Sequence, residues 1–295
     1  MNRDFAMEMR LKRLNPELHR RFADAVVALQ YNLSRYKLIF PEFTDHTNLH
    51  SMTVIDFANR LIGDQVERMS ADEIYALLMG SYLHDAGMGI SMQDYRLFSE
   101  QIDFGDYFDT HSREDYPAII RGFHHEYSGL FIRKYEGLFE FPSEAHCRAV
   151  IQIARGHRKT DLMDEEEYPP SFPLPGGGSM CLPYLAALIR LADEIDISSE
   201  RNPILLYDDG DYTSASELHW YKLTRAVRKV AVSEREFTIV ADTSDPELAA
   251  HVRDIAGKMQ GTLDTCRRAV CGRSPYIITQ ERVVLREEQE VRNNP

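Results

Sequence analysis

The sequence is poor in cysteine and has no long apolar run. Its 4 cysteines, Cys147, Cys181, Cys266 and Cys271, form no CxxC pair, which argues against a disulfide scaffold and a cysteine zinc site and indicates reduced thiols. No stretch reaches the roughly 18 apolar residues of a membrane-spanning helix. The start, MNRDFAMEMRLKRL, lacks the apolar core of a signal peptide. We therefore expect a cytoplasmic protein with no membrane partner.

Positive charge is also scarce in this chain of 295 residues. The 34 Lys and Arg stand against 47 Asp and Glu, a net charge of −13. Long-range repulsion would therefore oppose nonspecific binding of nucleic acid. A small anionic ligand is compatible with this charge where cations gather locally. The hydrophobic fraction of 43% and the charged fraction of 27% are those of a globular protein.

Helical periodicity and start signals dominate the first two hundred residues. After Asn15-Pro16, Leu18, Phe22, Val26 and Leu29 form a stripe at helical spacing. Further helices are expected to start at Ser70 with Glu73, which form a capping box, at Pro117, at Ser143 and at about Leu182. The ends expected for these four are Gly87 with Gly89, Tyr135, His157 and Ile197. The pattern predicts a mainly α fold, a helical bundle.

Two segments break this pattern. Thr160 to Met180 contains an acidic run, prolines and glycines, and it predicts a long loop of the kind that forms lids or binding loops. After Tyr207, DDGDYTSAS is typical of a connector. The rest predicts a hairpin of 226–232 with 237–241, a helix from Asp245-Pro246 and a strand over 276–285. We expect a helical domain over 1–207 and a small C-terminal α/β subdomain over 208–295.

Histidines and aspartates occupy positions where helices should face the core. His50 heads the apolar stripe Val54, Phe57 and Leu61. Others extend apolar rows on four further helices: His84 with Asp85, His124, His157 and Asp193. Each alone is more often a hydrogen-bonded core residue or an ion-pair partner.

Together these residues favour a metal site. Buried, ionised Asp85 and Asp193 would need a compensating cation, because an unpaired buried charge costs several kcal/mol. Arginines or a buried polar network are the alternatives. Mixed imidazole and carboxylate ligands suit Mn, Fe, Ni, Zn or Co better than Ca.

The residues and their surroundings resemble the HD superfamily of metal-dependent phosphohydrolases. FTDHTNLHSMTV, LLMGSYLHDAGMGIS, RGFHHEYSGLFI, IARGH and LIRLADEIDISSER occur in the order of that superfamily, over about residues 40 to 205. The nearest variant is the HD-CE type, a module that occurs beside Hsp90-like ATPase domains and also alone.

The resemblance implies metal ligation by His50, His84, Asp85 and Asp193. His124 and His157 match histidines that hold a second metal in some members and contact substrate phosphate in others. Because a helix turns about 100° per residue, either His124 or His125 can face the site, and both stripe and motif favour His124. His46, one turn before His50, is a candidate for orienting a ligand.

The implied activity is hydrolysis of a nucleotide or related phosphate ester through a metal-activated water. One or two divalent ions (Mn, Fe, Ni, Zn, Co or Mg) are the expected cofactor, Asp85, His124 and His157 are the expected catalytic residues, and Asp85 could bridge two ions. For the phosphate we expect Arg121, Arg158 and Lys159, while Arg190 and Arg201 flank Asp193. The GYP signature of cyclic-di-GMP phosphodiesterases is absent from the sequence.

The alternative is a module that senses a nucleotide, or acts as a scaffold, through a metal-bearing HD pocket without turnover. Expected partners are a small phosphate-containing substrate and, at the protein level, a second copy of the chain or a protein associated with an Hsp90-like ATPase.

Overall fold

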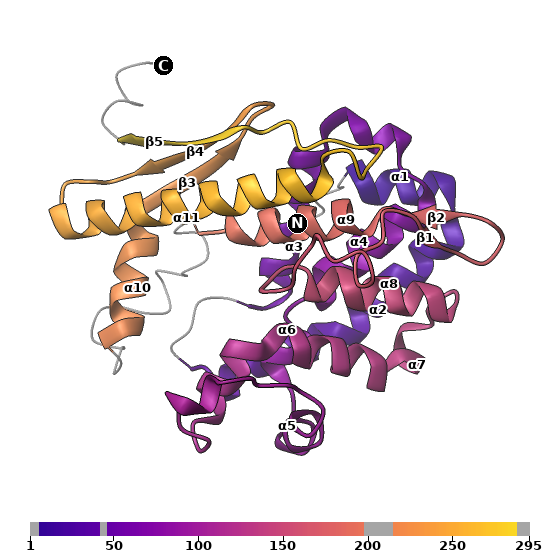
Figure 1. Cartoon of the computed structure of the whole chain (residues 1–295), viewed down its shortest axis with the longest axis horizontal. Helices are drawn as coiled ribbons and strands as arrows, with labels where there is room; N and C mark the ends of the chain where they lie inside the picture. Colours follow the sequence, from indigo (N-terminus) through magenta and orange to yellow (C-terminus); the bar gives the residue numbers. More distant parts are fainter. Residues whose placement is uncertain (1–5, 42–45, 198–214, 288–295) are drawn as a thin grey trace.

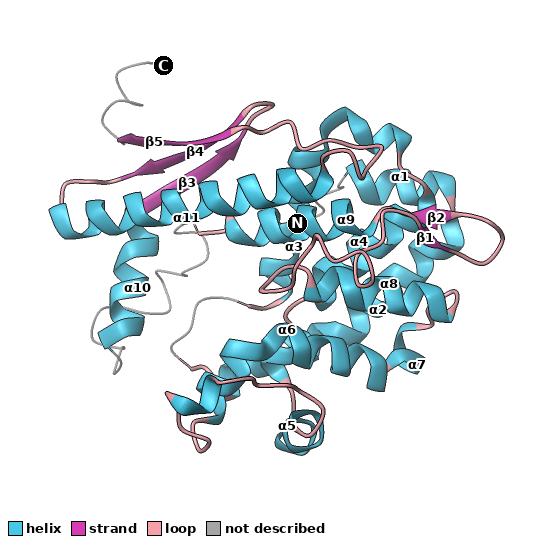
Figure 2. Cartoon of the chain, in the orientation of Figure 1, coloured by secondary structure: helices cyan, strands magenta, loops and turns pink. Residues whose placement is uncertain are grey.

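The chain folds into a bundle of α-helices with a small three-stranded sheet at one end (Figures 1 and 2). The computed structural model describes residues 6–41, 46–197 and 215–287. The helices of the bundle are α1 (Ala6–Leu14), α2 (Pro16–Ser34), α3 (Asn48–Ile62), α4 (Ala71–Leu83), α5 (Met92–Ser99), α6 (Tyr116–Lys134), α7 (Glu136–Phe139), α8 (Glu144–Arg155) and α9 (Leu182–Glu194). The 3₁₀ turns η1 (Arg35–Leu38), η2 (Gly63–Arg68), η3 (Ala86–Gly89) and η4 (Tyr107–Asp109) lie between them.

The C-terminal part contains α10 (Ala215–Ala226), β3 (Val227–Val232), β4 (Glu236–Ala241), α11 (Pro246–Val270) and β5 (Arg282–Glu287). β3 and β4 form an antiparallel hairpin, and β5 pairs with β4 in parallel. The mainly α fold with a small C-terminal α/β part is therefore confirmed. The boundary expected between residues 207 and 208 lies outside the described residues.

The helix starts follow the local sequence. Asn15 caps α2 by accepting a hydrogen bond from the backbone of Leu18, and Ser70 and Glu73 form the predicted capping box of α4. Ser143 and Asp245 cap α8 and α11 in the same way. These predictions are confirmed because capping depends on residues that are neighbours in the sequence.

Three of the four predicted helix ends differ from the structure, whereas α6 ends at Lys134, next to the predicted Tyr135. α4 ends at Leu83 instead of continuing to Gly87, because Asp85 has left the helical conformation (φ −101°, ψ 8°). Gly87 serves a different purpose: η3 packs so closely on α6 that a Cβ at this position would lie 2.4 Å from the carbonyl oxygen of His124. α8 ends at Arg155, two residues before His157, and α9 ends at Glu194.

The structure also contains elements that the sequence pattern does not predict. α1 was not expected, and α10 includes the end of the expected connector. The last strand begins at Arg282 instead of Tyr276, because the ring of Tyr276 stacks on Tyr184 of α9, with 4.7 Å between the ring centroids. The segment 160–180 is a loop as predicted, closed by the short antiparallel pair β1 (Phe172–Pro173) and β2 (Ser179–Met180).

A continuous apolar core joins the helical bundle to the C-terminal part. α9 is buried along most of its length, and α11 lies along it (Figure 1). Glu73 at the start of α4 reinforces this junction, since its carboxylate accepts hydrogen bonds from the Tyr276 hydroxyl (2.7 Å) and the Cys181 backbone (3.4 Å). Within the described ranges no helix has the length and apolarity needed to cross a membrane.

Candidate metal centre

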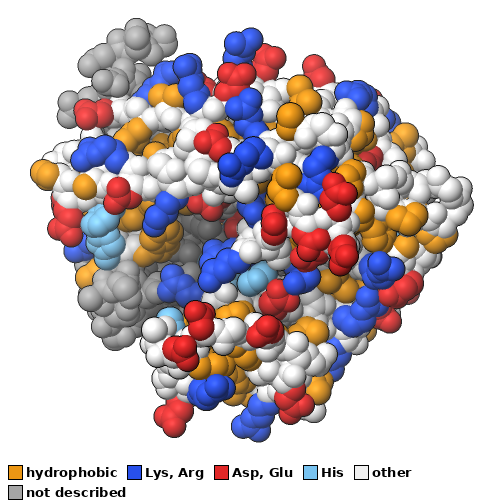
Figure 3. All heavy atoms as spheres, viewed as in Figure 1, with side chains coloured by type: hydrophobic (Ala, Val, Ile, Leu, Met, Phe, Trp, Pro, Cys, Tyr) orange, Lys and Arg blue, Asp and Glu red, His pale blue; other side chains and the backbone are white. Residues whose placement is uncertain are grey.

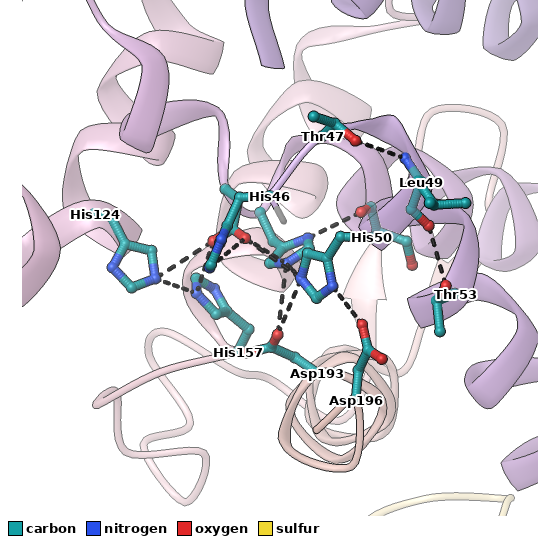
Figure 4. A network of polar contacts seen from close by, with 12 residues as sticks. His46, Thr47, Leu49, His50, Thr53, His124, His157, Asp193 and Asp196 are labelled. Carbon is teal, nitrogen blue, oxygen red and sulfur yellow. Dashed lines mark hydrogen bonds and ion pairs between the residues drawn. The ribbon is translucent and has the colours of Figure 1, made fainter. Parts of the chain in front are cut away.

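Five separate parts of the bundle bring histidines and aspartates to one buried cluster. His50 comes from α3, His84 and Asp85 follow α4, His124 lies on α6, His157 follows α8, and Asp193 lies in the last turn of α9. His50, His84, Asp85, His124 and His157 are all buried. In Figure 4 the side chains of His50, His124, His157 and Asp193 point toward a common centre. The structure therefore brings together all six residues expected as ligands.

One group of ligand atoms surrounds the Oδ2 atom of Asp85. The Nε2 atoms of His50 and His84 lie 3.4 and 3.3 Å from this oxygen and 3.2 Å from each other. Oδ1 of Asp193 lies 3.2 Å from Nε2 of His50 and 3.9 Å from Nε2 of His84. Four side chains, two histidines and two aspartates, thus present two nitrogens and two carboxylate oxygens to the same small volume.

A second group surrounds the other oxygen of the same carboxylate. Oδ1 of Asp85 lies 3.5 Å from Nε2 of His124 and 3.8 Å from Nε2 of His157. The two Nε2 atoms are 2.8 Å apart. Asp85 therefore connects the two groups, with one oxygen in each, and each group has the composition and spacing to hold a metal ion.

The histidines are oriented through their Nδ1 atoms. Three of them donate from Nδ1 to the backbone carbonyl three residues earlier: His84 to Ser81 (2.9 Å), His124 to Arg121 (2.8 Å) and His157 to Ala154 (2.6 Å). Each lies where the helix ends or breaks, since α6 has a non-helical residue at Phe123. Helix ends leave carbonyl groups without intrahelical partners, and these imidazoles satisfy them.

His50 is oriented by a carboxylate instead. Its Nδ1 donates to Oδ2 of Asp196 at 2.7 Å. Because carbonyl and carboxylate oxygens only accept hydrogen bonds, Nδ1 carries the hydrogen in all four imidazoles. In its neutral form each ring then directs the Nε2 lone pair into the cluster. This is the arrangement in which histidine binds metal.

This donor set fits a divalent cation. Two pairs of Nε2 lone pairs face each other at 3.2 and 2.8 Å, a repulsive arrangement unless positive charge lies between them. The two carboxyl groups also favour positive charge at the centre of the cluster. Burial raises the pKa of Asp85 and Asp193, but positive charge on the surrounding imidazoles outweighs burial and lowers both pKa values below the ordinary range. Where the imidazoles are neutral, a bound cation would take over that role.

Burial favours the metal-binding form of the two histidines in the second group. Burial lowers the pKa of His124 and that of His157, so both rings favour the neutral form that coordinates metal. Ionised carboxylates beside neutral imidazoles leave the cluster with negative charge that a cation would balance. The cluster can thus hold a metal, as the sequence predicted, and several first-row divalent ions accept this ligand set.

Neighbouring histidines have other environments. Nε2 of His46 lies 3.9 Å from Oδ2 of Asp85, at the edge of the first group. His125 turns away from Asp85 and lies beside Glu126, 3.5 Å from its Oε1 atom. Burial lowers the pKa of His125 to about 3. Of the adjacent pair, His124 is therefore the one that reaches the cluster.

Two residues with clear positioning contacts had no role in the sequence analysis. Asp196 orients His50, and the signal was present, since it lies three residues after Asp193 on the same helical row. The Ser128 hydroxyl donates to the His84 carbonyl (2.6 Å) and accepts from the Gly87 backbone (2.8 Å). Ser128 therefore ties the turn that contains Asp85 to α6.

The expected phosphate-binding cations differ in their surroundings. Arg158 and Lys159 directly follow His157, are exposed, and make no side-chain hydrogen bond or ion pair within the described residues. Arg121 is exposed on α6, one turn before His124. Arg190 is held by the carbonyls of Gly156 and Thr160, each at 2.7 Å, so it braces the segment around His157. Arg201 lies outside the described residues. Figure 3 shows Lys and Arg around a hollow near the middle of the face, where histidine is also visible.

A helical bundle whose separate helices bring histidines and a His-Asp doublet to a buried metal-type cluster has the character of an HD-type domain. The chain matches the sequence model of the HD-CE family over residues 40–275, which include every residue of the cluster. It therefore belongs to the HD-CE family. The match extends past the motifs that carry the resemblance and takes in α10, α11 and the β3–β4 hairpin. Searches of curated proteins and of solved structures find no match.

Proposed function

We propose that this chain is a metal-dependent phosphohydrolase that cleaves a nucleotide or a related phosphate ester. The observation that carries the proposal is the shared carboxylate of Asp85, which has an imidazole pair beside each of its oxygens. His50, His84, Asp85 and Asp193 would hold one divalent ion, and Asp85, His124 and His157 a second. Bound ions would supply Lewis-acid stabilisation of a phosphoryl oxygen and a water of lowered pKa.

The chain's own groups prepare the site. The Ser81, Arg121 and Ala154 carbonyls and the Asp196 carboxylate fix the ring orientations, which limits the reorganisation needed during the reaction. If only the first group is loaded, His124 or His157 would have to take up a proton at Nε2, against the effect of burial, before it could donate that proton to a leaving group. General acid catalysis of this kind contributes about 10²- to 10⁴-fold to a rate.

Arg158 and Lys159 provide the positive charge that the substrate phosphate needs. The net charge of −13 repels an anion at long range, so binding depends on cations close to the cluster. Both side chains follow His157 directly and form no ion pair within 4 Å of a described carboxylate, although the charge of Arg158 acts on that of Glu194. Arg121 adds a third cation on the neighbouring helix.

Elemental analysis and a screen of phosphoesters test the proposal together. Protein purified without chelator should contain a first-row divalent metal and should hydrolyse at least one mono-, di- or triphosphate nucleotide or phosphodiester. Asp193→Ala should lose metal and activity. Asp64→Ala, an exposed aspartate on η2 with no described hydrogen bond, is the matched control and should retain both.

The outcomes separate the alternatives. Full metal content and full activity in Asp193→Ala would refute the ligand assignment. Metal bound at this cluster without turnover of any phosphoester would instead support a sensing or scaffold module and contradict the hydrolase. Metal-free protein that is indifferent to chelator would contradict both.

A further inference from the structure

A second cluster of potential ligands lies at the junction of α10 and α11, and it shares no residue with the metal centre. His219 comes from α10, and Glu247 and His251 come from the first turns of α11. Each offers one ligand atom, and these atoms all lie within 4.8 Å of one another. The rings of His219 and His251 meet edge to face, with 4.5 Å between their centroids.

The backbone explains the convergence. Glu247 and His251 are four residues apart, so they lie on the same face of α11, one turn from each other. α10 packs against α11 and leads directly into β3, and this packing brings His219 to that face. Figure 1 shows α10 extending away from the bundle, and Figure 3 shows histidine at the surface over these helices. Glu247 is exposed, and both histidines are half-buried.

The side chains of this cluster lack other partners in the described part of the chain. The Nδ1 atom of His251 is buried and has no hydrogen bond there. None of the three side chains forms a hydrogen bond or ion pair with a described residue. A buried imidazole nitrogen without a partner is costly, and a cation bound at this Nδ1 atom, with His219 and Glu247 as further ligands, would satisfy it.

We infer that His219, Glu247 and His251 form a second site, for a divalent cation of the Zn²⁺ type. Two imidazoles and one carboxylate are a ligand set that zinc accepts with a fourth position open. Ca²⁺ and Mg²⁺ require more oxygen ligands than this cluster offers. A cation here joins α10 to α11 and so fixes the helix that precedes the β3–β4 hairpin. The inference does not depend on the proposed hydrolase activity.

Trp220 provides a local reporter, because it is the only tryptophan of the chain and directly follows His219. Its fluorescence is measured while Co²⁺, a paramagnetic quencher, is titrated into the full-length protein. We expect saturable quenching that excess Zn²⁺ reverses. His251→Ala and Glu247→Ala should each raise the dissociation constant for Co²⁺ by about tenfold or more, since each removes one ligand of three.

Two controls assign the signal. His111→Ala removes an exposed histidine outside both clusters and should leave the titration unchanged. His84→Ala disables the metal centre and should also leave the quenching of Trp220 intact, which distinguishes the two sites. Absence of saturable quenching would overturn the inference. So would identical titrations for the wild type and the exposed-residue variant Glu247→Ala, which has little reason to disturb folding.

Discussion

Gly87 lies where the turn after Asp85 meets α6, and its substitution tests how the metal centre is held. A Cβ at this position would lie 2.4 Å from the carbonyl oxygen of His124 and 2.7 Å from the backbone nitrogen of Ser128. Both are backbone atoms of α6, so neither can rotate away like the end of a side chain. Gly87→Ala must therefore move η3 and α6 apart, to the 3.0 Å or more that real Cβ contacts show.

The expected cost follows from two contributions. Overpacking of a rigid contact costs about 1–3 kcal/mol. The hydrogen bond from the Gly87 backbone to the Ser128 hydroxyl (2.8 Å) would weaken as well, which adds about 1 kcal/mol. A loss of about 2–4 kcal/mol corresponds to a fall in melting temperature of roughly 3–6 °C for a chain of this size. The same movement separates Asp85 from His124, so metal affinity should fall too.

Urea and thermal unfolding of Gly87→Ala measure this effect. The matched control is Gly257→Ala, because Gly257 lies inside α11 and a Cβ there meets nothing within 4 Å. The control should be stabilised by up to about 1 kcal/mol, since alanine costs less backbone entropy in a helix than glycine does. The same substitution should thus have opposite signs at the two positions. Equal stability of Gly87→Ala and wild type would refute the close approach of η3 to α6.

Four further predictions follow from the site and its surroundings. Asp196→Asn should weaken metal binding by about 10- to 100-fold, because the amide no longer fixes the tautomer of His50; an unchanged affinity in a competitive chelator titration would contradict this role. Chelation of bound metal should lower the melting temperature, since a ligand at 100 times its Kd contributes about 2.7 kcal/mol of stability; the check is calorimetry before and after chelator. Arg158→Ala should raise KM for a phosphoester by about tenfold with little change in kcat, and an unchanged KM would remove Arg158 from the phosphate site. Burial raises the pKa of Asp94, but hydrogen bonds from Lys134, Ser91 and Tyr135 together outweigh burial and lower that pKa below its ordinary value of 3.8. The stabilising effect of this carboxylate is therefore present above pH 3.8 and lost on acidification below it, so Asp94→Asn should cost about 1–3 kcal/mol at pH 7 and less at pH 3 by urea unfolding.

The predictable part of the fold is the part that local chemistry decides. Asn15, Ser70 and Ser143 announce their helices because a cap bonds to a backbone only two or three residues away. The helix ends were harder to predict from the sequence. α4 stops at Leu83 because the turn after it packs on α6, a contact between distant segments. The strand β5 also starts later than expected, because its partner β4 and the stacking of Tyr276 on Tyr184 are long-range features.

The convergence of the cluster could be predicted because His50 and the other candidate residues interrupt apolar stripes, and a stripe indicates which way a side chain faces. Their exact environment could not be predicted. The bonds from Nδ1 to the Ser81, Arg121 and Ala154 carbonyls depend on where each helix ends or breaks. The division of the cluster into two groups likewise depends on the rotation of one carboxylate, Asp85. No sequence pattern encodes that angle.

The hydrogen bonds of Glu73 have a consequence for the order of folding. This capping residue completes its bonding only when the Tyr276 hydroxyl returns to it across 203 residues. Closing a loop of this length costs chain entropy before the contact can stabilise the fold. We therefore expect α4 to form early from its own local signals, and its first turn to reach full hydrogen bonding only in a late step, when the last part of the chain docks.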